Sequence, residues 1–180
     1  MANLPDPTAT LTGDERAIYE DILARRKARG VDHLGPYIPL LNHPALARLI
    51  EQLGFYYKYE ATLPRDVYQF IVLATAKRSG VAFEWADHIA AAKRAGLPQA
   101  VINAVAGAAD VPSPFDIVAQ TMDCAFAYRS IPSGLQDQIV QRFGLKGLIE
   151  IVTLCGFYTL IGMVNAGFDV PLPAQGPSSA

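Results

Sequence analysis

Residues 64–96 read PRDVYQFIVLATAKRSGVAFEWADHIAAAKRAG, and this stretch contains two helical patterns separated by a glycine break. Pro64 suits the start of a helix, because its missing N–H and fixed φ angle cost nothing there. The apolar residues of the first helical face are Val67, Phe70, Ile71 and Ala74. Gly80 then interrupts the pattern, and a second helix from about residue 83 ends at Gly96. The segment therefore predicts two consecutive helices.

The rest of the chain repeats this arrangement of apolar, helix-spaced segments between proline and glycine breaks. Further helices are expected near residues 12–30, 42–57, 98–107, 115–128, 133–143 and 147–166. No run alternates apolar and polar residues between hairpin turns, so strands are at most minor. We predict one all-α domain, a helical bundle of about seven or eight helices, over residues 12–169. Residues 1–11 and 170–180 are predicted to be flexible, and residues 31–41 to form an extended connector.

The charge balance argues against a nucleic-acid partner. The chain has 15 basic and 17 acidic residues and a formal net charge of -2, so it lacks the basic field that nucleic acid or an anionic membrane requires. Its first residues have no secretory signal, and a cytoplasmic location is expected. Residues 151–168 are uncharged but marginal in length for a membrane span. We expect them to form a helix buried on all sides, at a subunit interface.

The segment RSGVAFEWADH, residues 78–88, carries the most suggestive pair of side chains. Glu84 and His88 stand at positions i and i+4, so they share one face of the predicted helix. The apolar stripe of this helix consists of Trp85, Ile89 and Ala92. Asp87 is predicted on the opposite side, while Glu84 and His88 lie at the border of the stripe, where partial burial shifts a pKa. The alternative is an ordinary surface pair, which contributes only about 0.3 kcal/mol.

Motifs for metals and organic cofactors are missing from the sequence. There is no H-E-x-x-H pattern and no third ligand beside Glu84 and His88, so we predict no metal. There is also no glycine-rich phosphate loop and no dinucleotide fingerprint, so we predict no cofactor. The two cysteines, Cys124 and Cys155, lie in apolar runs and form no CxxC pair.

Three segments in order, LGPYIPLLNHPALARLIEQLG, LPRDVYQFIVLATAKRSGVAFEWADH and AAKRAGLPQAVINAV, resemble the carboxymuconolactone decarboxylase family. The later stretch LIEIVTLCGFYTLIGMVNAGFDVPLP resembles the C-terminal helix of that family, and the likeness covers roughly residues 20–173. The resemblance implies an alkyl hydroperoxidase D-like, all-α fold. It also implies a homo-oligomer, a trimer or hexamer, with sites near the subunit contacts.

Two residue types decide which branch of the family the chain resembles. The alkyl hydroperoxidase D-type branch has a CxxC followed by a His, but Val81 and Glu84 occupy the two cysteine positions here. Thiol–disulfide peroxidase chemistry therefore has no nucleophile. Many relatives also carry a Glu nineteen positions before the His, where this chain has Gln69. Gln keeps the hydrogen-bonding shape but cannot act as a base, which puts a proton relay through that position in doubt.

The resemblance implies a carboxy-lyase, or a related lyase or isomerase, that acts on a small carboxylated lactone or keto acid in the breakdown of aromatic compounds. His88 would donate or accept the proton, with Glu84 orienting it or acting as its acid–base partner. Arg78 would bind the substrate carboxylate. The remaining substrate-binding residues are expected to be Gln69, Trp85 and Tyr158.

Each of these expectations has a structural alternative. Arg78 suits the C-terminal end of a helix, Trp85 suits a core, and the Tyr158 hydroxyl can satisfy a buried position. His33 and His43 are read as bystanders in loops. At the level of function, the alternative is a non-catalytic helical oligomer that binds a small molecule, and the Gln69 departure keeps this alternative open. A peroxidase is disfavoured because the CxxC pair is absent.

Overall fold

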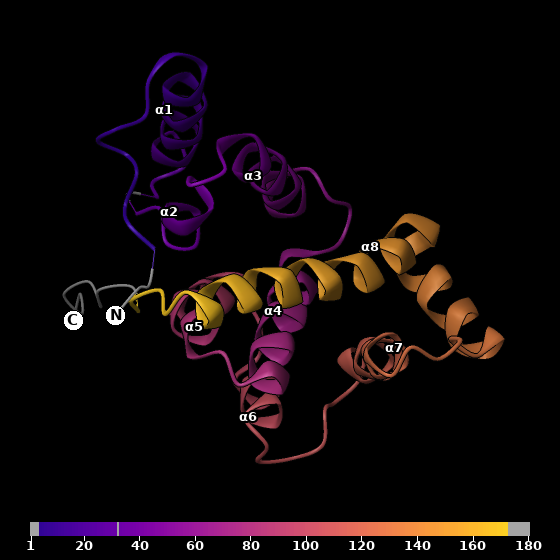
Figure 1. Cartoon of the computed structure of the whole chain (residues 1–180). Coiled ribbons are helices and arrows are strands. Elements are labelled where there is room, and N and C mark those ends of the chain that lie inside the picture. The colour runs from indigo at the N-terminus through magenta and orange to yellow at the C-terminus, as the bar shows by residue number, and fades with distance from the viewer. Residues whose placement is uncertain (1–3, 32, 173–180) are drawn as a thin grey trace.

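In the computed structural model, which describes residues 4–31 and 33–172, the chain is an all-α bundle (Figure 1). Within these residues there are eight helices and no strand, which confirms the predicted fold class. The helices are α1 (Gly13–Lys27), α2 (Tyr37–Leu40), α3 (Pro44–Tyr59), α4 (Arg65–Ser79), α5 (Ala82–Arg94), α6 (Gln99–Val105), α7 (Phe115–Phe126) and α8 (Ser133–Gly167).

Helix α4 is the centre of the bundle. It contacts α5, α6, α7 and α8, and Figure 1 shows α8 crossing over α4 and α5 while α1 to α3 lie on the other side of α8. Nine residues of α4 are buried, among them Tyr68, Phe70 and Ile71. A helix that is apolar on nearly every side must be enclosed by other helices. Residues 64–96, which contain α4, therefore form the centre of the fold.

Helix α8 confirms the predicted interruption between two apolar segments. Gly144 has φ 73° and ψ 171°, a backbone conformation outside the helical range. Glycine adopts a positive φ at no steric cost, and the chain changes direction sharply in this part of α8 (Figure 1). The predicted helices over residues 133–143 and 147–166 are therefore two arms of α8.

Residues 151–168, in the second arm of α8, were expected to be buried on all sides at a subunit interface, and within the single chain they are buried only in part. The helix is long and apolar enough to cross a membrane by length and composition, and 56% of its most apolar stretch is buried within the molecule. One side packs on α3, α4, α5 and α7. The opposite side exposes large apolar residues, which are Leu145, Ile149, Leu160 and Met163.

The predicted extended connector contains a short helix. Residues Tyr37–Leu40 form α2, which begins after Pro36 and tolerates Pro39 because the first turn of a helix leaves its N–H groups without partners in any case. The next helix, α3, is capped by His43, whose Nδ1 accepts from the Leu46 N–H at 3.3 Å. His43 therefore has a local structural role.

The chain ends were predicted to be flexible. Of residues 1–11, the described part begins at residue 4 and is tied to the bundle by two hydrogen bonds. Asn42 donates to the Pro5 carbonyl at 3.1 Å, and Arg16 donates to the Thr8 carbonyl at 2.9 Å. Of the predicted tail, residues 173–180 lie outside the described residues.

A buried carboxylate on α8 holds the loop between α3 and α4. Glu150 is 4% exposed and accepts hydrogen bonds from the Thr62 N–H, the Thr62 hydroxyl, the Leu63 N–H and the Tyr56 hydroxyl, at 2.8 to 3.0 Å. These bonds outweigh the effect of burial and keep the pKa of Glu150 below its ordinary value. The loop between α3 and α4 is therefore held in place by a residue of α8 that lies 87 to 88 positions later in the sequence.

Candidate active site

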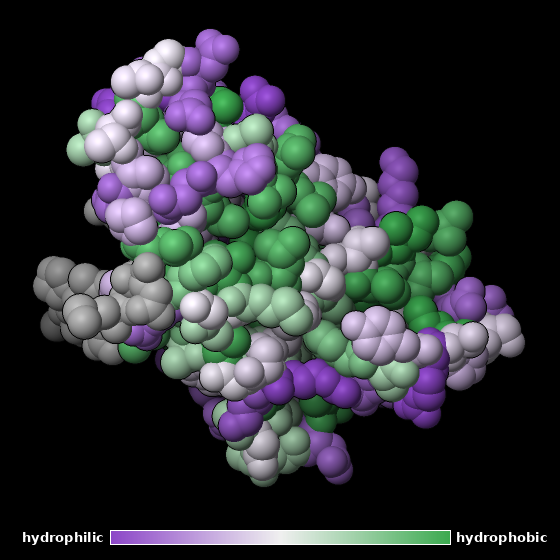
Figure 2. Space-filling model, in the orientation of Figure 1, coloured by the Kyte–Doolittle hydropathy of each residue, from purple (hydrophilic) through white to green (hydrophobic). Residues whose placement is uncertain are grey.

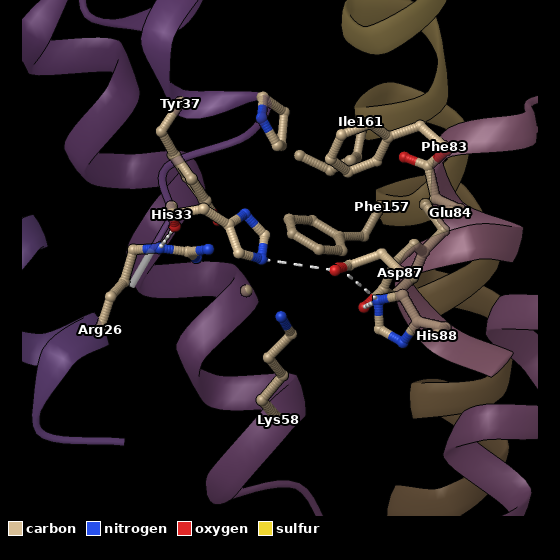
Figure 3. Close-up of a pocket in the computed structure, with 13 residues that line it drawn as sticks. Arg26, His33, Tyr37, Lys58, Phe83, Glu84, Asp87, His88, Phe157 and Ile161 are labelled. Carbon is tan, nitrogen blue, oxygen red and sulfur yellow. Dashed lines mark hydrogen bonds and ion pairs between the residues drawn. The ribbon is translucent and has the colours of Figure 1, made fainter. Parts of the chain in front are cut away.

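A narrow pocket lies where the link between α1 and α2 meets α3, α5 and α8 (Figure 3). Its volume is about 40 Å³, which is room for a few water molecules. The polar residues that line it are Arg26, His33, Lys58, Glu84, Asp87, His88 and the two tyrosines Tyr37 and Tyr158. The apolar part of the wall is formed by Phe83, Phe157 and Ile161. A partly apolar lining with converging polar groups is typical of a small-molecule site, but such sites usually measure roughly 300–1,000 Å³, so this pocket must widen to admit a ligand larger than a few water molecules.

Helix α5 turns its polar face, and not its apolar stripe, into this pocket. Glu84 and His88 are 3% and 6% exposed, whereas Trp85 and Ile89 are only partly buried. Asp87 also lines the pocket, so its predicted place on the opposite side is wrong. Positions i, i+3 and i+4 share a helix face, and packing against α4 and α8 buries this face of α5 rather than the neighbouring one.

His88 is held between a side chain of α4 and a side chain of α8. Its Nδ1 lies 3.0 Å from Gln69 Oε1, and its Nε2 lies 3.3 Å from the Tyr158 hydroxyl. Because the amide oxygen can only accept, Nδ1 carries the ring proton and Nε2 accepts from Tyr158. The Tyr158 hydroxyl in turn contacts the Tyr68 hydroxyl. The result is a buried chain of hydrogen bonds, Tyr68–Tyr158–His88–Gln69.

The imidazole of His88 is neutral at physiological pH. Burial lowers its pKa to about 3, the charge of Lys58 acts in the same direction, and Asp87 acts in the opposite one. Gln69 cannot offset these effects because its amide carries no charge. The protonation state of His88 therefore follows chiefly from its burial.

Replacing Gln69 by Glu is expected to raise the pKa of His88 by about 1 to 3 pH units, because a carboxylate at this distance stabilises the imidazolium. The measurement is an NMR titration of the histidine ring signals in the wild type and in Gln69→Glu. Gln138→Glu, at an exposed position of α8, is the matched control and should leave the titration of His88 unchanged. An unchanged His88 titration in folded Gln69→Glu would contradict the role given to Gln69.

Glu84 is held by α8 and not by His88. Its Oε1 accepts from Asn165 Nδ2 at 2.5 Å, while Oε2 has no hydrogen-bond partner in the described structure. Burial raises the pKa of Glu84, and the bond from Asn165 opposes that effect only in part. No hydrogen bond between Glu84 and His88 therefore supports the expected role of Glu84 in orienting His88. Glu84 instead lines the pocket with a buried carboxyl group, one oxygen of which has no hydrogen-bond partner in the described structure.

Asp87 lies between two histidines at the pocket wall. Its carboxylate oxygens are 3.5 Å from His33 Nε2 and 3.7 Å from His88 Nε2, as the dashed lines in Figure 3 show. Burial raises the pKa of Asp87, but the bond from His33 and the neighbouring positive charges outweigh it and bring the value to about 2. His33, which the sequence presented as a bystander, thus belongs to the pocket.

Two residues expected to bind substrate lie elsewhere. Arg78 donates to Asp123 at 2.7 Å and stacks on Phe126, with its guanidinium carbon 4.7 Å from the ring centre, so it joins α4 to α7. Trp85 packs against the core and lines a separate surface groove with Val81. Neither residue lines the pocket of Glu84 and His88.

The described residues offer neither a cysteine in the pocket nor a cluster of metal ligands. Neither cysteine lines the pocket, and burial raises the pKa of Cys155 to about 12, so its thiol stays protonated. Within the described residues, no three His, Cys, Asp or Glu side chains are grouped as metal ligands.

The fold matches that of solved proteins along nearly its whole length. A crystal structure of the debrominase Bmp8, a cysteine-to-alanine variant in complex with 2,3,4-tribromopyrrole, superposes with a TM-score of 0.69 over 97% of this chain and 95% of that one, at 14% identity. The apo structure of Bmp8 gives a TM-score of 0.66 over 89% and 88%, also at 14% identity. Likeness at this level of identity concerns the fold alone.

Sequence comparison finds a family likeness over part of the chain. No curated protein matches this sequence. Residues 44–127, a little under half of the chain, match the model of the carboxymuconolactone decarboxylase family, and this region contains α3 to α7 with Gln69, Glu84 and His88. The chain therefore has an alkyl hydroperoxidase D-like fold with a central region similar to the carboxymuconolactone decarboxylase family, and it lacks the CxxC pair.

Proposed function

We propose that this protein is a lyase that removes carbon dioxide from a small carboxylated lactone or keto acid, using side chains alone as acid and base. The observation that carries the proposal is Glu84, a buried carboxyl group of raised pKa with one oxygen that has no hydrogen-bond partner in the described structure, in the same narrow pocket as His88. A carboxyl group whose pKa is raised by burial retains its proton to higher pH and suits the role of a general acid. The match of residues 44–127 to the family model supports the same reaction class.

The reaction places a different demand on each side chain. When the bond to the leaving carboxylate breaks, its electron pair moves into the conjugated carbonyl group, and carbon dioxide and an enolate form. Glu84 then transfers its proton from Oε2 to the enolate carbon, and water returns a proton to Glu84. The charge of the enolate oxygen needs a hydrogen-bond donor while it exists.

Tyr158 and His88 provide that donor. Burial raises the pKa of Tyr158 well above its ordinary value, so its hydroxyl keeps its proton. The bond from Tyr158 to His88 Nε2 is 3.3 Å, which is long for an O–H donor, and the hydroxyl is free to turn to a substrate oxygen. Between turnovers His88 Nε2 accepts a hydrogen bond from the Tyr158 hydroxyl, which keeps its proton.

The competing proposal is a non-catalytic oligomer that uses the same pocket to bind a small molecule. The pocket alone fits both proposals, but a buried carboxyl oxygen without a hydrogen-bond partner is a cost that acid–base chemistry would explain and simple binding would not. Debromination is not proposed, because the likeness to Bmp8 concerns the fold and no sulfur lines this pocket.

Proton NMR in deuterated buffer with γ-carboxymuconolactone tests the proposal. The wild type should consume the substrate and place one deuterium on the carbon that lost carbon dioxide. The double variant Glu84→Gln/His88→Ala should leave the substrate intact while keeping its helical circular dichroism. Absence of turnover by folded wild-type protein would remove this substrate and favour the binding protein.

We further propose that the protein assembles as a homo-oligomer through the face formed by α3 and α8. The second arm of α8 exposes Leu145, Ile149 and Met163 at 63%, 56% and 70%, on one side of the helix, and α3 exposes Leu49 at 60%. Figure 2 shows hydrophobic surface over both helices. Apolar patches of this kind mark interaction surfaces, and closed symmetric assemblies are the common outcome.

The double substitution Ile149→Asp/Met163→Asp is expected to convert the assembly into monomers, because two charges would have to be buried at each contact. Light scattering coupled to gel filtration measures the mass. Tyr128→Asp, which alters a residue that is 98% exposed and outside α3 and α8, should keep the wild-type mass. A wild type that is monomeric at micromolar concentration would contradict the proposal.

A further inference from the structure

The side of the pocket formed by α1 and α3 carries two positively charged side chains, Arg26 and Lys58. Arg26 Nε donates to the His33 carbonyl at 2.9 Å, and the guanidinium lies 5.1 Å from the centre of the Tyr37 ring. Lys58 points toward His33 and Asp87 (Figure 3). Among the described residues, no carboxylate lies within ion-pair distance of Arg26 or Lys58.

The negative groups of the pocket do not balance these charges. Asp87 is shared between His33 and His88 at 3.5 and 3.7 Å, and burial makes Glu84 retain its proton to higher pH than usual. Lys58 is partly buried, and burial, with the charge of Arg26, lowers its pKa to about 8. An ammonium group held away from water without a counter-ion is unfavourable, and a bound anion would remove that cost.

The two sides of the pocket therefore differ in polarity. Glu84 lies beside the apolar wall of Phe83 and Ile161, while Arg26 and Lys58 lie on the α1 and α3 side. A carboxylate that is to leave as neutral carbon dioxide would be stabilised by an ion pair, and its loss would be slowed. The carboxylate that Arg26 and Lys58 would bind is therefore one that stays on the molecule.

We infer that Arg26 and Lys58 form a subsite for a carboxylate that is retained through the reaction. The preferred ligands are small dicarboxylates, held by one carboxylate while the reacting end faces Glu84 and Tyr158. Arg26 and Lys58 then replace Arg78 as the residues that select for an acidic substrate. The identity of the reacting end rests on the proposed function, whereas the subsite itself is a matter of binding.

Binding of non-reacting probes tests the subsite apart from catalysis. Malonate, succinate and the neutral succinamide are titrated into the wild type, Lys58→Met and Lys93→Met, and the NMR signals of the histidine rings report binding in the pocket. Lys93 is exposed on the last turn of α5 and is the matched control. We expect the wild type and Lys93→Met to bind a dicarboxylate, Lys58→Met to bind it at least about tenfold more weakly, and none to bind succinamide.

A pH series adds a second readout. The affinity of the wild type should fall as the pH rises above about 8, where Lys58 loses its charge, and the affinity of Lys58→Met should lack this decline. The charged groups that act on Lys58 are Arg26 on α1, Arg65 on α4, Asp87 on α5 and Glu51 on α3, with His33 beside it in the pocket. Asp87 stays ionised over this range because its pKa is about 2.

The outcomes separate the subsite from the reaction. Equal affinity of Lys58→Met and the wild type for both dicarboxylates would overturn the subsite, as would absence of saturable binding by the wild type. Selective dicarboxylate binding by a protein that leaves γ-carboxymuconolactone unchanged would support the subsite and contradict the proposed reaction.

Discussion

The substitution Glu84→Gln is expected to lower kcat by about 10²- to 10⁴-fold and to change KM by only a few-fold, because it removes the proton that the enolate carbon receives. Gln has the same shape, and its amide oxygen can still accept from Asn165, which donates to Glu84 at 2.5 Å. The effect on stability should therefore be small. Initial rates of substrate consumption, followed by ultraviolet absorbance, give kcat and KM.

The pH profile of kcat sharpens this prediction. A general acid works only in its protonated form, so wild-type activity should be present at low pH and fall as the pH rises through the pKa of Glu84, which burial raises. The residual activity of Glu84→Gln should not show this decline. Glu60→Gln, at an exposed position, is the control. If Glu84→Gln kept more than half of the wild-type kcat, Glu84 would not be the proton donor.

The substitution Glu150→Ala is expected to lower the free energy of unfolding by about 3 kcal/mol or more. It leaves the Thr62 and Leu63 N–H groups, which donate to Glu150 at 3.0 Å, without acceptors, and an unsatisfied buried donor costs roughly 1 to 3 kcal/mol. Urea unfolding followed by circular dichroism measures the difference. Asp137→Ala, at an exposed position of the same helix, should change the stability by less than about 0.5 kcal/mol.

The effect of Glu150 should also depend on pH with a defined sign. The pKa of Glu150 in the folded protein lies below its ordinary value of 4.5, so its contribution is complete above that value and is lost as the pH falls through the folded pKa. The stability difference between the wild type and Glu150→Ala should therefore shrink below pH 4.5. A difference that stays constant through that range would show that the carboxylate charge is not what holds the loop.

Helical periodicity could have placed one of the misplaced residues. Gln69 and Arg78 both belong to α4 and are nine positions apart, which on an α-helix is about 900°, or half a turn apart in direction. Gln69 faces His88, so Arg78 faces away from it and reaches α7. The helical period of α4 therefore predicts that Arg78 points away from the pocket, once Gln69 is taken as the partner of His88.

For two other residues that line the pocket, His33 and Lys58, the neighbouring sequence does not indicate a functional role. His33 lies in the link between α1 and α2, and its place depends on the bond from Arg26 to its carbonyl and on the packing of α1 against α3. Lys58 occurs in the last turn of α3, where a lysine is usual and favoured by the helix dipole. Nothing in its neighbours along the chain distinguishes it from a solvated side chain.

The sequence alone determined the all-α class, the approximate bounds of most helices, a break between residues 143 and 147 and the shared face of Glu84 and His88. These features follow from backbone geometry over a few residues, because helical period and glycine conformations are local properties. Only the tertiary structure decided which face of α5 is buried and which distant residues meet it, such as Tyr158, 70 positions from His88, and Asn165, 81 positions from Glu84. Those pairings arise from the packing of helices on one another, which sums many weak contacts across the whole chain.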